Sequence, residues 1–570
     1  MNAAALIAVL LAALAALRPL SDRLRLSRAK HRSIHGHARL AKRLARLVPY
    51  YEFDEGRFFD SDGAPAAVAG DRRRGFFRLA TLLRERADQT IRRSEQLSSG
   101  ISDLQFTSAY RVPFPYRALV RRHLNVGALT HETHGVEVVN VDGHASLDVA
   151  GSYGVNVFGY DFYKTCIDAG IERVRTLGPL LGSYHPIVED NVARLKAISG
   201  KDEVSFHMSG TEAVMQAVRL ARYHTGRSHL VRFCGAYHGW WDDVQPGVGT
   251  PKRVDDVYTL EDMSRHTLAV LRQRKDIACV LVNPLQMLHP NAAAPGDSTL
   301  FASRRERRVD RDAYSDWLRE LRRVCTERGI VLIFDEVFVG FRIAYRGAQQ
   351  YFGIDADLVT YGKTVGGGLP VGVLCGSARL MKRYRDDRPT DICFARGTFN
   401  AHPYVMGAMN EFLTRLDEPS MRASYDQLEA VWNARAARLN AQLANEGLPV
   451  RVANLVSIWT ICYTAPTRYN WMFQYYLRAQ GLALSWVGSG RLVFSHNYSD
   501  ADVAAVASRF LGAARAMYAD GWWWHPADAT DRSISRQMLA EMIAARLSWR
   551  VPIHATRSVT IGSKSSPRST

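Results

Sequence analysis

Short apolar runs and amphipathic stretches alternate along the middle of the chain. The apolar runs are typical of buried strands, and the stretches at 211–223 and about 310–328 have the spacing of helices. The runs are EVSFHM (203–208), HLVRFCG (229–235), ACVLVNP (278–284), VLIFDEV (331–337) and LVTYGK (358–363). Continuous apolar strands separated by helices predict an α/β fold, with a mostly parallel sheet that helices cover on both faces.

Both flanks of this region have a different pattern. Before it, the runs VEVVNV and SLDVAG around the turn Asp142-Gly143 predict short strands. After about residue 404 helices dominate, with strands near 449–463 and 491–495. Further upstream, 75–98 has a helical pattern, whereas 53–75 is rich in Gly, Asp, Ala and Arg and is predicted to be a linker.

The first 50 residues combine apolar and basic character. Residues 3–17 carry no charge, but this run is shorter than the roughly 20 residues that a membrane-spanning helix needs. The segment 37–48 places Leu40, Leu44 and Leu47 on one helical face among basic residues, as helices at membrane surfaces do. Two interpretations stay open: the segment associates with the inner face of a membrane, or it packs on the folded body.

The net charge of +18 lies mostly at the two ends of the chain. Residues 1–50 carry +9 and residues 525–570 carry +4, so the long region between them has only a small excess. A nucleic-acid enzyme would place its basic stripe on the folded body, so we expect no nucleic-acid partner. The seven cysteines are widely spaced and include no C-x-x-C pair, which argues against a zinc site and favours a reducing, cytoplasmic location.

Side chains suited to catalysis or ligand binding follow the predicted strands. Ligands of such sheets bind outside the carboxyl ends of the strands. Ser209-Gly210-Thr211 opens a helix whose start suits a phosphate, although an ordinary N-cap would look the same. Tyr237-His238-Gly239 offers a ring that would stack on a flat ligand, although a core aromatic cluster is the commoner explanation.

A carboxylate and a lysine follow two further strands. Asp335 ends a strand too apolar to bury a carboxylate without a partner, which is either a structural arginine or a cationic ring nitrogen. Lys363 precedes Gly366-Gly367-Gly368 at the end of the next strand, where it is placed to form a Schiff base. A phosphate site, a stacking ring, a carboxylate and this lysine together describe a site for pyridoxal phosphate.

Five motifs make the chain resemble the class III aminotransferases of pyridoxal phosphate fold type I. They are SGTEAVMQAVRLAR, FCGAYHGWWDD, FDEVFVGFR, DLVTYGKTVGGGLPVGVLCG and GTFNAHPYVMGA, and the resemblance covers roughly residues 105–520. It implies a large cofactor-binding domain and a smaller α+β domain from both chain ends. The implied divisions are 1–50 (apolar and basic), 51–104 (linker and helical extension), 105–155 (small domain), 156–403 (large domain), 404–522 (small domain) and 523–570 (a basic tail, partly disordered).

The resemblance also implies roles for the matched residues. Lys363 would bind the cofactor covalently and shuttle the proton, and Asp335 would pair with the pyridine nitrogen. Tyr237, with His238 beside it, would stack on one ring face, and Val337 would pack on the other. The remaining matched positions are Ser209, Gly210 and Thr211 at the phosphate, Thr398 at the phosphate of a neighbouring subunit in a homodimer, and Ser152 and Tyr153 at the substrate entrance.

Two positions depart from the family pattern. Asn283 stands where the family usually has glutamate, which removes one carboxylate near the cofactor and changes the polar network of the pocket. Phe338 replaces the glutamine of many members, but the branch that contains glutamate-1-semialdehyde aminomutase tolerates an apolar residue there.

The expected activity is transfer of an amino group from an amino donor to a keto or aldehyde acceptor in biosynthesis. The upstream stretch, with VPFPYRALVRRH, resembles aminotransferases attached to polyketide and peptide synthases, so the acceptor is expected to be carrier-bound or lipid-like. Two alternatives stay open. One is a 1,2-aminomutase of the glutamate-1-semialdehyde kind, and the other is a membrane-tethered, non-catalytic scaffold on the same fold.

Overall fold

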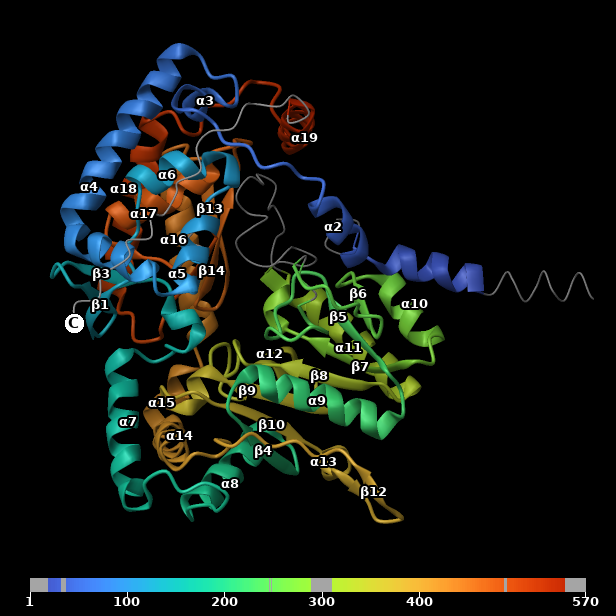
Figure 1. Cartoon of the computed structure of the whole chain (residues 1–570). Coiled ribbons are helices and arrows are strands. Elements are labelled where there is room, and N and C mark those ends of the chain that lie inside the picture. Colours follow the sequence, from blue (N-terminus) through green and yellow to red (C-terminus); the bar gives the residue numbers. More distant parts are fainter. Residues whose placement is uncertain are drawn as a thin grey trace, which may run out of the picture.

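A seven-stranded sheet forms the centre of the large domain (Figure 1). The computed structural model describes residues 19–31, 37–245, 247, 249–288, 310–485 and 490–548. The strands are β4 (Glu203–His207), β5 (His229–Phe233), β6 (Val257–Leu260), β7 (Ile277–Val282), β8 (Val331–Asp335), β9 (Leu358–Gly362) and β10 (Gly372–Gly376). Their order is β4-β10-β9-β8-β7-β5-β6, and β10 alone runs against the others. The predicted sheet is therefore confirmed as mostly parallel.

Alternate residues of the strands face two separate layers of helices. Cys279 and Leu281 of β7 pack in a cluster with α9 (Gly210–Thr225). Val280 and Val282 of the same strand belong to the cluster on the opposite face, which includes α11 (Arg311–Arg328). Because a strand that is buried on both faces must be apolar at every position, the predicted runs lack the usual alternation of polar and apolar residues.

Further helices complete the large domain. On its lower side in Figure 1, α7 (Tyr160–Val174) packs closely against α14 (Pro403–Leu416), and α8 (Ile187–Ser199) lies beside them. Shorter helices lie between the strands: α10 (Arg265–Gln273), α12 (Gly347–Phe352) and α13 (Ala378–Met381).

The small domain is built from both parts of the chain that flank the large domain. One sheet contains β1 (Thr130–His134), β2 (Glu137–Asn140), β3 (Ala145–Asp148) and β15 (Leu482–Ala483). A second contains β13 (Val450–Leu455), β14 (Ile458–Tyr463) and β16 (Arg491–Val493), with helices α16 (Leu428–Asn445), α17 (Phe473–Ala479) and α18 (Asp500–Ala519). Strand β15 pairs with β3 in parallel, which confirms that a smaller α+β unit forms from both flanks.

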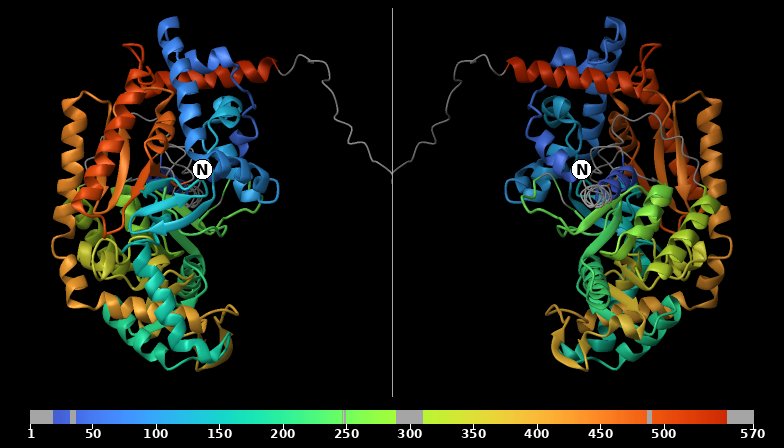
Figure 2. Two further views of the ribbon diagram at one scale, coloured as in Figure 1. Left: turned by 90° about the vertical axis from the view of Figure 1, so that its left-hand side faces the viewer. Right: turned by 90° about the vertical axis from the view of Figure 1, so that its right-hand side faces the viewer.

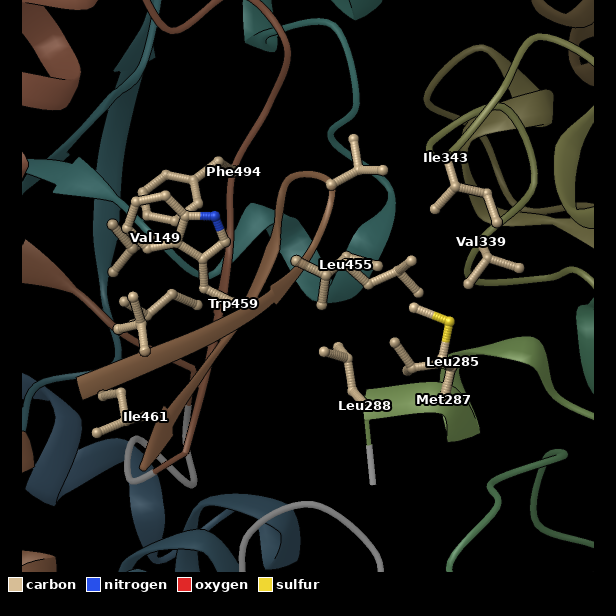
Figure 3. Close-up of a cluster of buried hydrophobic side chains, with 14 of the residues drawn as sticks. Val149, Leu285, Met287, Leu288, Val339, Ile343, Leu455, Trp459, Ile461 and Phe494 are labelled. Carbon is tan, nitrogen blue, oxygen red and sulfur yellow. The ribbon is translucent and has the colours of Figure 1, made fainter. Parts of the chain in front are cut away.

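An apolar cluster and one arginine join the two domains. Figure 3 shows Leu285 and Leu288, from the turn after β7, on the side that faces Leu455 of β13. Arg342 is fully buried beside this cluster. Its guanidinium donates to the carbonyl of Phe494 at 2.5 Å and to the carbonyl of Asn156 at 2.8 Å, so this large-domain side chain is bonded to the small domain and to the start of the large domain, where the chain crosses between the two.

The segment 53–75 is not the predicted linker. It contains α3 (Glu55–Asp60) and the start of α4 (Ala66–Ser98), and its rings Phe58 and Phe59 are buried. Figures 1 and 2 show α4 and the C-terminal helix α19 (Asp531–Ser548) at the same end of the molecule, and Arg57 of α3 forms an ion pair with Glu541 of α19. The prediction was wrong because a composition rich in glycine and charge is typical of linkers. In this segment those residues belong to helices that pack on the small domain.

Buried ion pairs hold these terminal segments in place. Arg72 of α4 bonds both carboxylate oxygens of Asp62 at 2.8 Å and also the carbonyl of Gly521 at 3.0 Å. Arg468 bonds both oxygens of Glu541, from α19, at 2.7 and 2.8 Å. Part of the predicted basic tail is thus an ordered helix, whereas the end that was predicted to be disordered, SKSSPRST, lies outside the described residues.

The amphipathic helix predicted at 37–48 is present as α2 (Ala38–Ala45). Arg39 forms an ion pair with Asp255, while Leu40, Leu44 and Leu47 are 50%, 40% and 51% exposed. The apolar run at 3–17 lies outside the described residues. Within the part of the chain that the structure describes, no helix is both long and apolar enough to cross a membrane.

Removing Arg72 is expected to destabilise the fold. Arg72→Met leaves the carboxylate of Asp62 without its partner in a buried site, which should lower the free energy of unfolding by about 3–5 kcal/mol. The matched control is Arg73→Met, since Arg73 forms an exposed ion pair with Glu55 and its loss should cost at most about 1 kcal/mol. Urea titration followed by circular dichroism measures both. Equal effects in the two variants would contradict a structural role for the buried pair.

Candidate active site

Ten of the predicted site residues line one cavity of about 850 Å³ between the large and small domains. They are Tyr153, Ser209, Gly210, Thr211, Tyr237, His238, Asn283, Asp335, Val337 and Lys363. Ser152 and Thr398 do not line it within one chain. The hydroxyl of Ser152 lies 3.1 Å from that of Tyr160, and Thr398 is exposed in the segment before α14.

The start of α9 supplies a place for an anion. Ser209 caps this helix, since its hydroxyl accepts a hydrogen bond from the backbone N–H of Glu212 at 3.3 Å. A Cβ at Gly239, whose φ is +92°, would lie 2.4 Å from the hydroxyl of Thr211. Glycine therefore lets the loop after β5 approach the helix start. The free N–H groups and the positive end of the helix dipole both favour a phosphate there.

Asp335 ends β8 and is 3% exposed. One carboxylate oxygen lies 2.7 Å from Nδ1 of His238, and the other accepts a hydrogen bond from the backbone N–H of Val337 at 3.1 Å. These bonds hold the carboxylate in a fixed orientation at the cavity wall. A buried carboxylate needs such partners, and it stabilises a cation placed against it.

Lys363 directly follows β9 and reaches the same cavity. Burial lowers the pKa of its amine, against an opposing effect of the negative charge of Asp335. A lowered pKa increases the fraction of neutral, nucleophilic amine. The backbone of Lys363 is left-handed, with φ at +52°, a conformation that costs energy in a residue other than glycine and that is frequent at functional sites.

Tyr237 and Asn283 form a bonded pair at the cavity. The amide of Asn283 donates to the backbone carbonyl of Tyr237 at 3.1 Å and accepts from the N–H of Leu285 at 3.1 Å. A glutamate cannot donate in this way when it is ionised, so Asn283 replaces a charge with a brace on the Tyr237 loop. Tyr237 is 50% exposed, and burial followed by the charge of Asp335 raises the pKa of its phenol.

Several lining residues were not predicted from the sequence. The small domain contributes Tyr153, which was predicted at the entrance. It also contributes Arg491 and Val493 of β16, which were not predicted. The apolar residues Met208, Leu285 and Leu369 complete much of the wall. Phe338 lies 5.4 Å, at its ring centroid, from the amine of Lys363. Strand β16 has three residues and lies far along the chain from the other cavity residues, so its sequence gives no local sign that it lines a cavity.

The donor set fits pyridoxal phosphate. An anion site at α9, a fixed carboxylate at Asp335 and an amine with a lowered pKa at Lys363 match the phosphate, the ring nitrogen and the aldehyde of that group. Among the residues described, no group of histidine, cysteine and acidic side chains is placed to hold a metal ion.

Comparisons with known proteins agree with this geometry. The family described as aminotransferase class-III matches residues 119–244 and 311–511. A glutamate-1-semialdehyde 2,1-aminomutase of Nitratidesulfovibrio vulgaris (strain DSM 19637 / Miyazaki F) is 34% identical over 417 residues, which is 67% of this chain and 89% of that protein. One from Desulfotalea psychrophila is 32% identical over 384 residues, covering 62% of this chain and 81% of that protein.

Solved structures share the fold. A transaminase with PLP bound has a TM-score of 0.58 at 25% identity and covers 72% of this chain and 94% of its own. A glutamate-1-semialdehyde aminomutase from Pseudomonas aeruginosa PAO1 has a TM-score of 0.61 at 19% identity and covers 80% of this chain and 99% of its own. With the family match over more than half of its length, the chain belongs to the class III aminotransferases, enzymes of fold type I whose cofactor is pyridoxal phosphate.

Proposed function

We propose that this enzyme transfers an amino group from an amino donor to a keto or aldehyde acceptor in a biosynthetic pathway. The observation that carries the proposal is the arrangement of Lys363, Asp335 and the start of α9 around one cavity. When bound there, pyridoxal phosphate supplies an electron sink for the carbon that carries the amino group.

The roles of the chain's own groups follow from their positions. Lys363 would hold the aldehyde carbon of the cofactor through Nζ, and its amine, when free, would move a proton between the two carbons that exchange the nitrogen. Asp335 would keep the ring nitrogen of the bound cofactor protonated. At a separation of about 4 Å and an effective dielectric of about 20, the attraction is about 4 kcal/mol, enough to shift the pKa of that nitrogen by about 3 units.

Other residues position the cofactor. Ser209, Gly210 and Thr211 would bind its phosphate at the helix start. Tyr237 would stack on one face of the ring and Val337 would pack on the other. His238 orients Asp335 through the 2.7 Å contact at Nδ1.

The acceptor is proposed to carry an apolar chain, such as a carrier-bound or lipid-like ketone. The apolar wall of the cavity supports this class, because Met208, Leu285 and Leu369 have no charge to solvate a polar acceptor. The alternative is a 1,2-aminomutase, which the names of the relatives favour. An aminomutase needs no separate amino donor, so turnover of glutamate 1-semialdehyde alone separates the two. A non-catalytic scaffold would have no use for a buried lysine at this site.

The covalent site is testable by trapping. Borohydride should abolish the visible absorbance of the yellow holoenzyme and leave the cofactor on the peptide that contains Lys363. Lys363→Ala should lower turnover by at least about 10⁴-fold, because it removes both the covalent bond and the proton shuttle. Peptide mapping by mass spectrometry locates the label. Lys201, another partly buried lysine, is the control, since Lys201→Ala should keep the label. A label on any lysine other than Lys363 would refute the assignment.

A homodimer is proposed, in which Thr398 reaches the cofactor phosphate of the partner subunit. Exposed aromatic residues surround this segment and support an interface: Tyr184, Tyr384, Phe394 and Phe399 are each more than half exposed. They border or lie next to a groove of about 1250 Å³ at β4, one of the two edge strands of the sheet. Apolar groups gathered on one surface are typical of a protein interface.

Charges on this surface should separate the subunits. The double variant Phe394→Glu/Phe399→Glu is expected to sediment as a monomer near 63.8 kDa, whereas the wild type sediments at twice that mass. Loss of the partner's Thr398 should also weaken retention of the cofactor. Tyr518→Glu, on α18, is the control because it adds a charge at an equally exposed aromatic. A wild-type monomer, or a double variant that remains dimeric, would contradict the proposed interface.

Association of the N-terminal segment with an anionic membrane is a separate proposal. It rests on the exposed row Leu40, Leu44 and Leu47 of α2 and the following turn. On the other side of the helix, Lys42 bonds the carbonyl of Lys252 at 3.1 Å, so the polar side contacts the catalytic domain and the apolar side is left outward. An exposed apolar face flanked by basic residues binds anionic bilayers.

Vesicle sedimentation tests the proposed membrane association. Deletion of residues 1–50, or Leu40→Ser/Leu44→Ser/Leu47→Ser, should abolish binding to phosphatidylserine-containing vesicles, because each removes the apolar face. Activity on a soluble acceptor should remain. Leu82→Ser/Leu97→Ser, at exposed leucines of α4, is the control. If the deletion variant binds these vesicles as well as the full chain does, the membrane proposal is wrong. If the deletion variant is insoluble and the triple variant still binds the vesicles, the segment is instead part of the folded body and the membrane proposal is also wrong.

A further inference from the structure

The C-terminal helix α19 has two unlike faces, and one of them packs on the body of the protein. Ile534 is 7% exposed, and the side-chain amide of Gln537 donates to the carbonyl of Ser61 at 3.0 Å. The carboxylate of Glu541 accepts two hydrogen bonds from Arg468. Spacings of three and four residues place side chains on one side of a helix, so Ile534, Gln537 and Glu541 mark its inner face.

The opposite face of α19 is apolar. Leu539, Ile543 and Leu547 follow one another at intervals of four and are 54%, 53% and 62% exposed. With about 3.6 residues per turn, these positions lie on the side of the helix away from Glu541. Single exposed aliphatic residues are common on any protein, but a continuous row of them marks a surface that binds another body.

Arginines flank this row, and along the described length of α19 no acid lies beside it. The exposed Arg532, Arg536 and Arg546 are on the same side of the helix. Of the two acids in α19, Glu541 faces the body and Asp531 is the first residue. The outward face is therefore apolar and positive, which complements an anionic surface.

This face lies next to the end of the exposed row of α2. The guanidinium of Arg546 donates to the carbonyl of Leu47 at 3.0 Å, and Leu47 is the last member of the row that begins with Leu40 and Leu44. Two helices from opposite ends of the chain, each with an apolar row and basic neighbours, thus meet at one place.

A second copy of the chain does not account for the outward face of α19. Figures 1 and 2 show α19 at the end of the molecule opposite α13, and α13 borders the groove proposed above as the subunit interface. A partner subunit seated at that groove would leave α19 uncovered.

We propose that α19 binds the surface of an anionic bilayer, as a second contact beside α2. The inference takes its class of partner from the membrane association proposed above, whereas the face of α19 is a separate observation. Such a bilayer offers acyl chains to the row Leu539, Ile543 and Leu547 and anionic headgroups to the arginines. An arginine keeps its charged end among the headgroups while its stem lies along apolar surface, so both kinds of side chain are accommodated together.

Two contacts on one folded body bind differently from one. A single amphipathic signal attaches weakly and reversibly, whereas two act together because binding of the first raises the local concentration of the second. Loss of either helix face should therefore weaken the attachment strongly even though the other face is intact. Because α2 and α19 are far apart in the sequence, only the folded chain presents both faces side by side.

Sedimentation of the full-length holoenzyme with phosphatidylcholine vesicles, with and without phosphatidylserine, tests the apolar row. Leu539→Ser/Ile543→Ser/Leu547→Ser, with α2 unchanged, should weaken binding to the phosphatidylserine-containing vesicles at least about tenfold. Circular dichroism checks that the variant is folded. The matched control removes three exposed apolar side chains elsewhere and should bind as the wild type does: Leu82→Ser/Leu97→Ser/Val431→Ser.

The same assay tests the charges. Arg532→Gln/Arg536→Gln should weaken binding to the phosphatidylserine-containing vesicles roughly tenfold or more, because each basic residue near an anionic surface adds to the attraction. Its binding should also depend less on the phosphatidylserine content than that of the wild type. Arg219→Gln/Arg438→Gln, at exposed arginines of α9 and α16, is the control for an equal loss of charge.

A dye on α19 measures direct contact with the bilayer. The seven native cysteines are buried, so a single introduced cysteine is labelled selectively. An environment-sensitive dye on Ile543→Cys should shift its emission to the blue when phosphatidylserine-containing vesicles are added. The same dye on Ser424→Cys, at an exposed position of α15, should not shift.

The outcomes separate this inference from the proposal for α2. If the variants of α2 lose vesicle binding while both variants of α19 bind as the wild type does, the inference is wrong and the proposal for α2 stands. The reverse pattern supports α19 alone. An unshifted dye on a protein that sediments with the vesicles also overturns the inference. A wild type that binds neither kind of vesicle overturns both, and an acidic protein is then the partner class that fits the face.

Discussion

The burial of one charged side chain, Arg342, fixes the relation between the two domains. It is fully buried, and burial lowers its pKa only to about 10, so it remains a cation at neutral pH. A cation in that position needs acceptors, and it finds them in the hydroxyl of Ser457 and the carbonyls of Phe494 and Asn156. Ser457 and Phe494 belong to the small domain, and Asn156 lies at the start of the large domain. Asn156 and Phe494 adjoin the segments that carry Tyr153 and Arg491 to the cavity. The catalytic wall therefore depends on a charge that the chemistry does not use.

Within the large domain, the parallel sheet brings the site residues together. Strands β4, β5, β7, β8 and β9 point the same way, so the residues that follow them meet at one edge. Asp335 and Lys363 are brought together in this manner although no hydrogen bond joins them. The apolar strands also create the low-dielectric surroundings that lower the pKa of Lys363. The same burial forces Asp335 to take His238 as a partner, and so the core determines the electrostatics of the site.

Much of this arrangement could be predicted from the sequence. The five apolar runs are β4, β5, β7, β8 and β9, because a fully buried strand has a strong local signal. β6 was missed, as it is short and includes polar residues, and β10 was missed because it follows a glycine-rich turn. The segment 53–75 was misjudged since the partners that bury Phe58 and Arg72 come from the far end of the chain. Arg491 and Leu285 could not be placed at the cavity, because tertiary packing alone brings them there.

The hydrogen bonds of Arg72 have a consequence for how the polypeptide matures as it is synthesised. Its guanidinium bonds the carbonyl of Gly521, 449 positions further along the chain. On a ribosome α4 thus emerges with Asp62 already made but long before Gly521 exists, and the bond between Arg72 and Gly521 has to wait for that segment. Domains usually fold from the N-terminus as they appear. Here the contact between α4 and Gly521 can form only after the segment at Gly521 has been synthesised, so this part of the fold closes late.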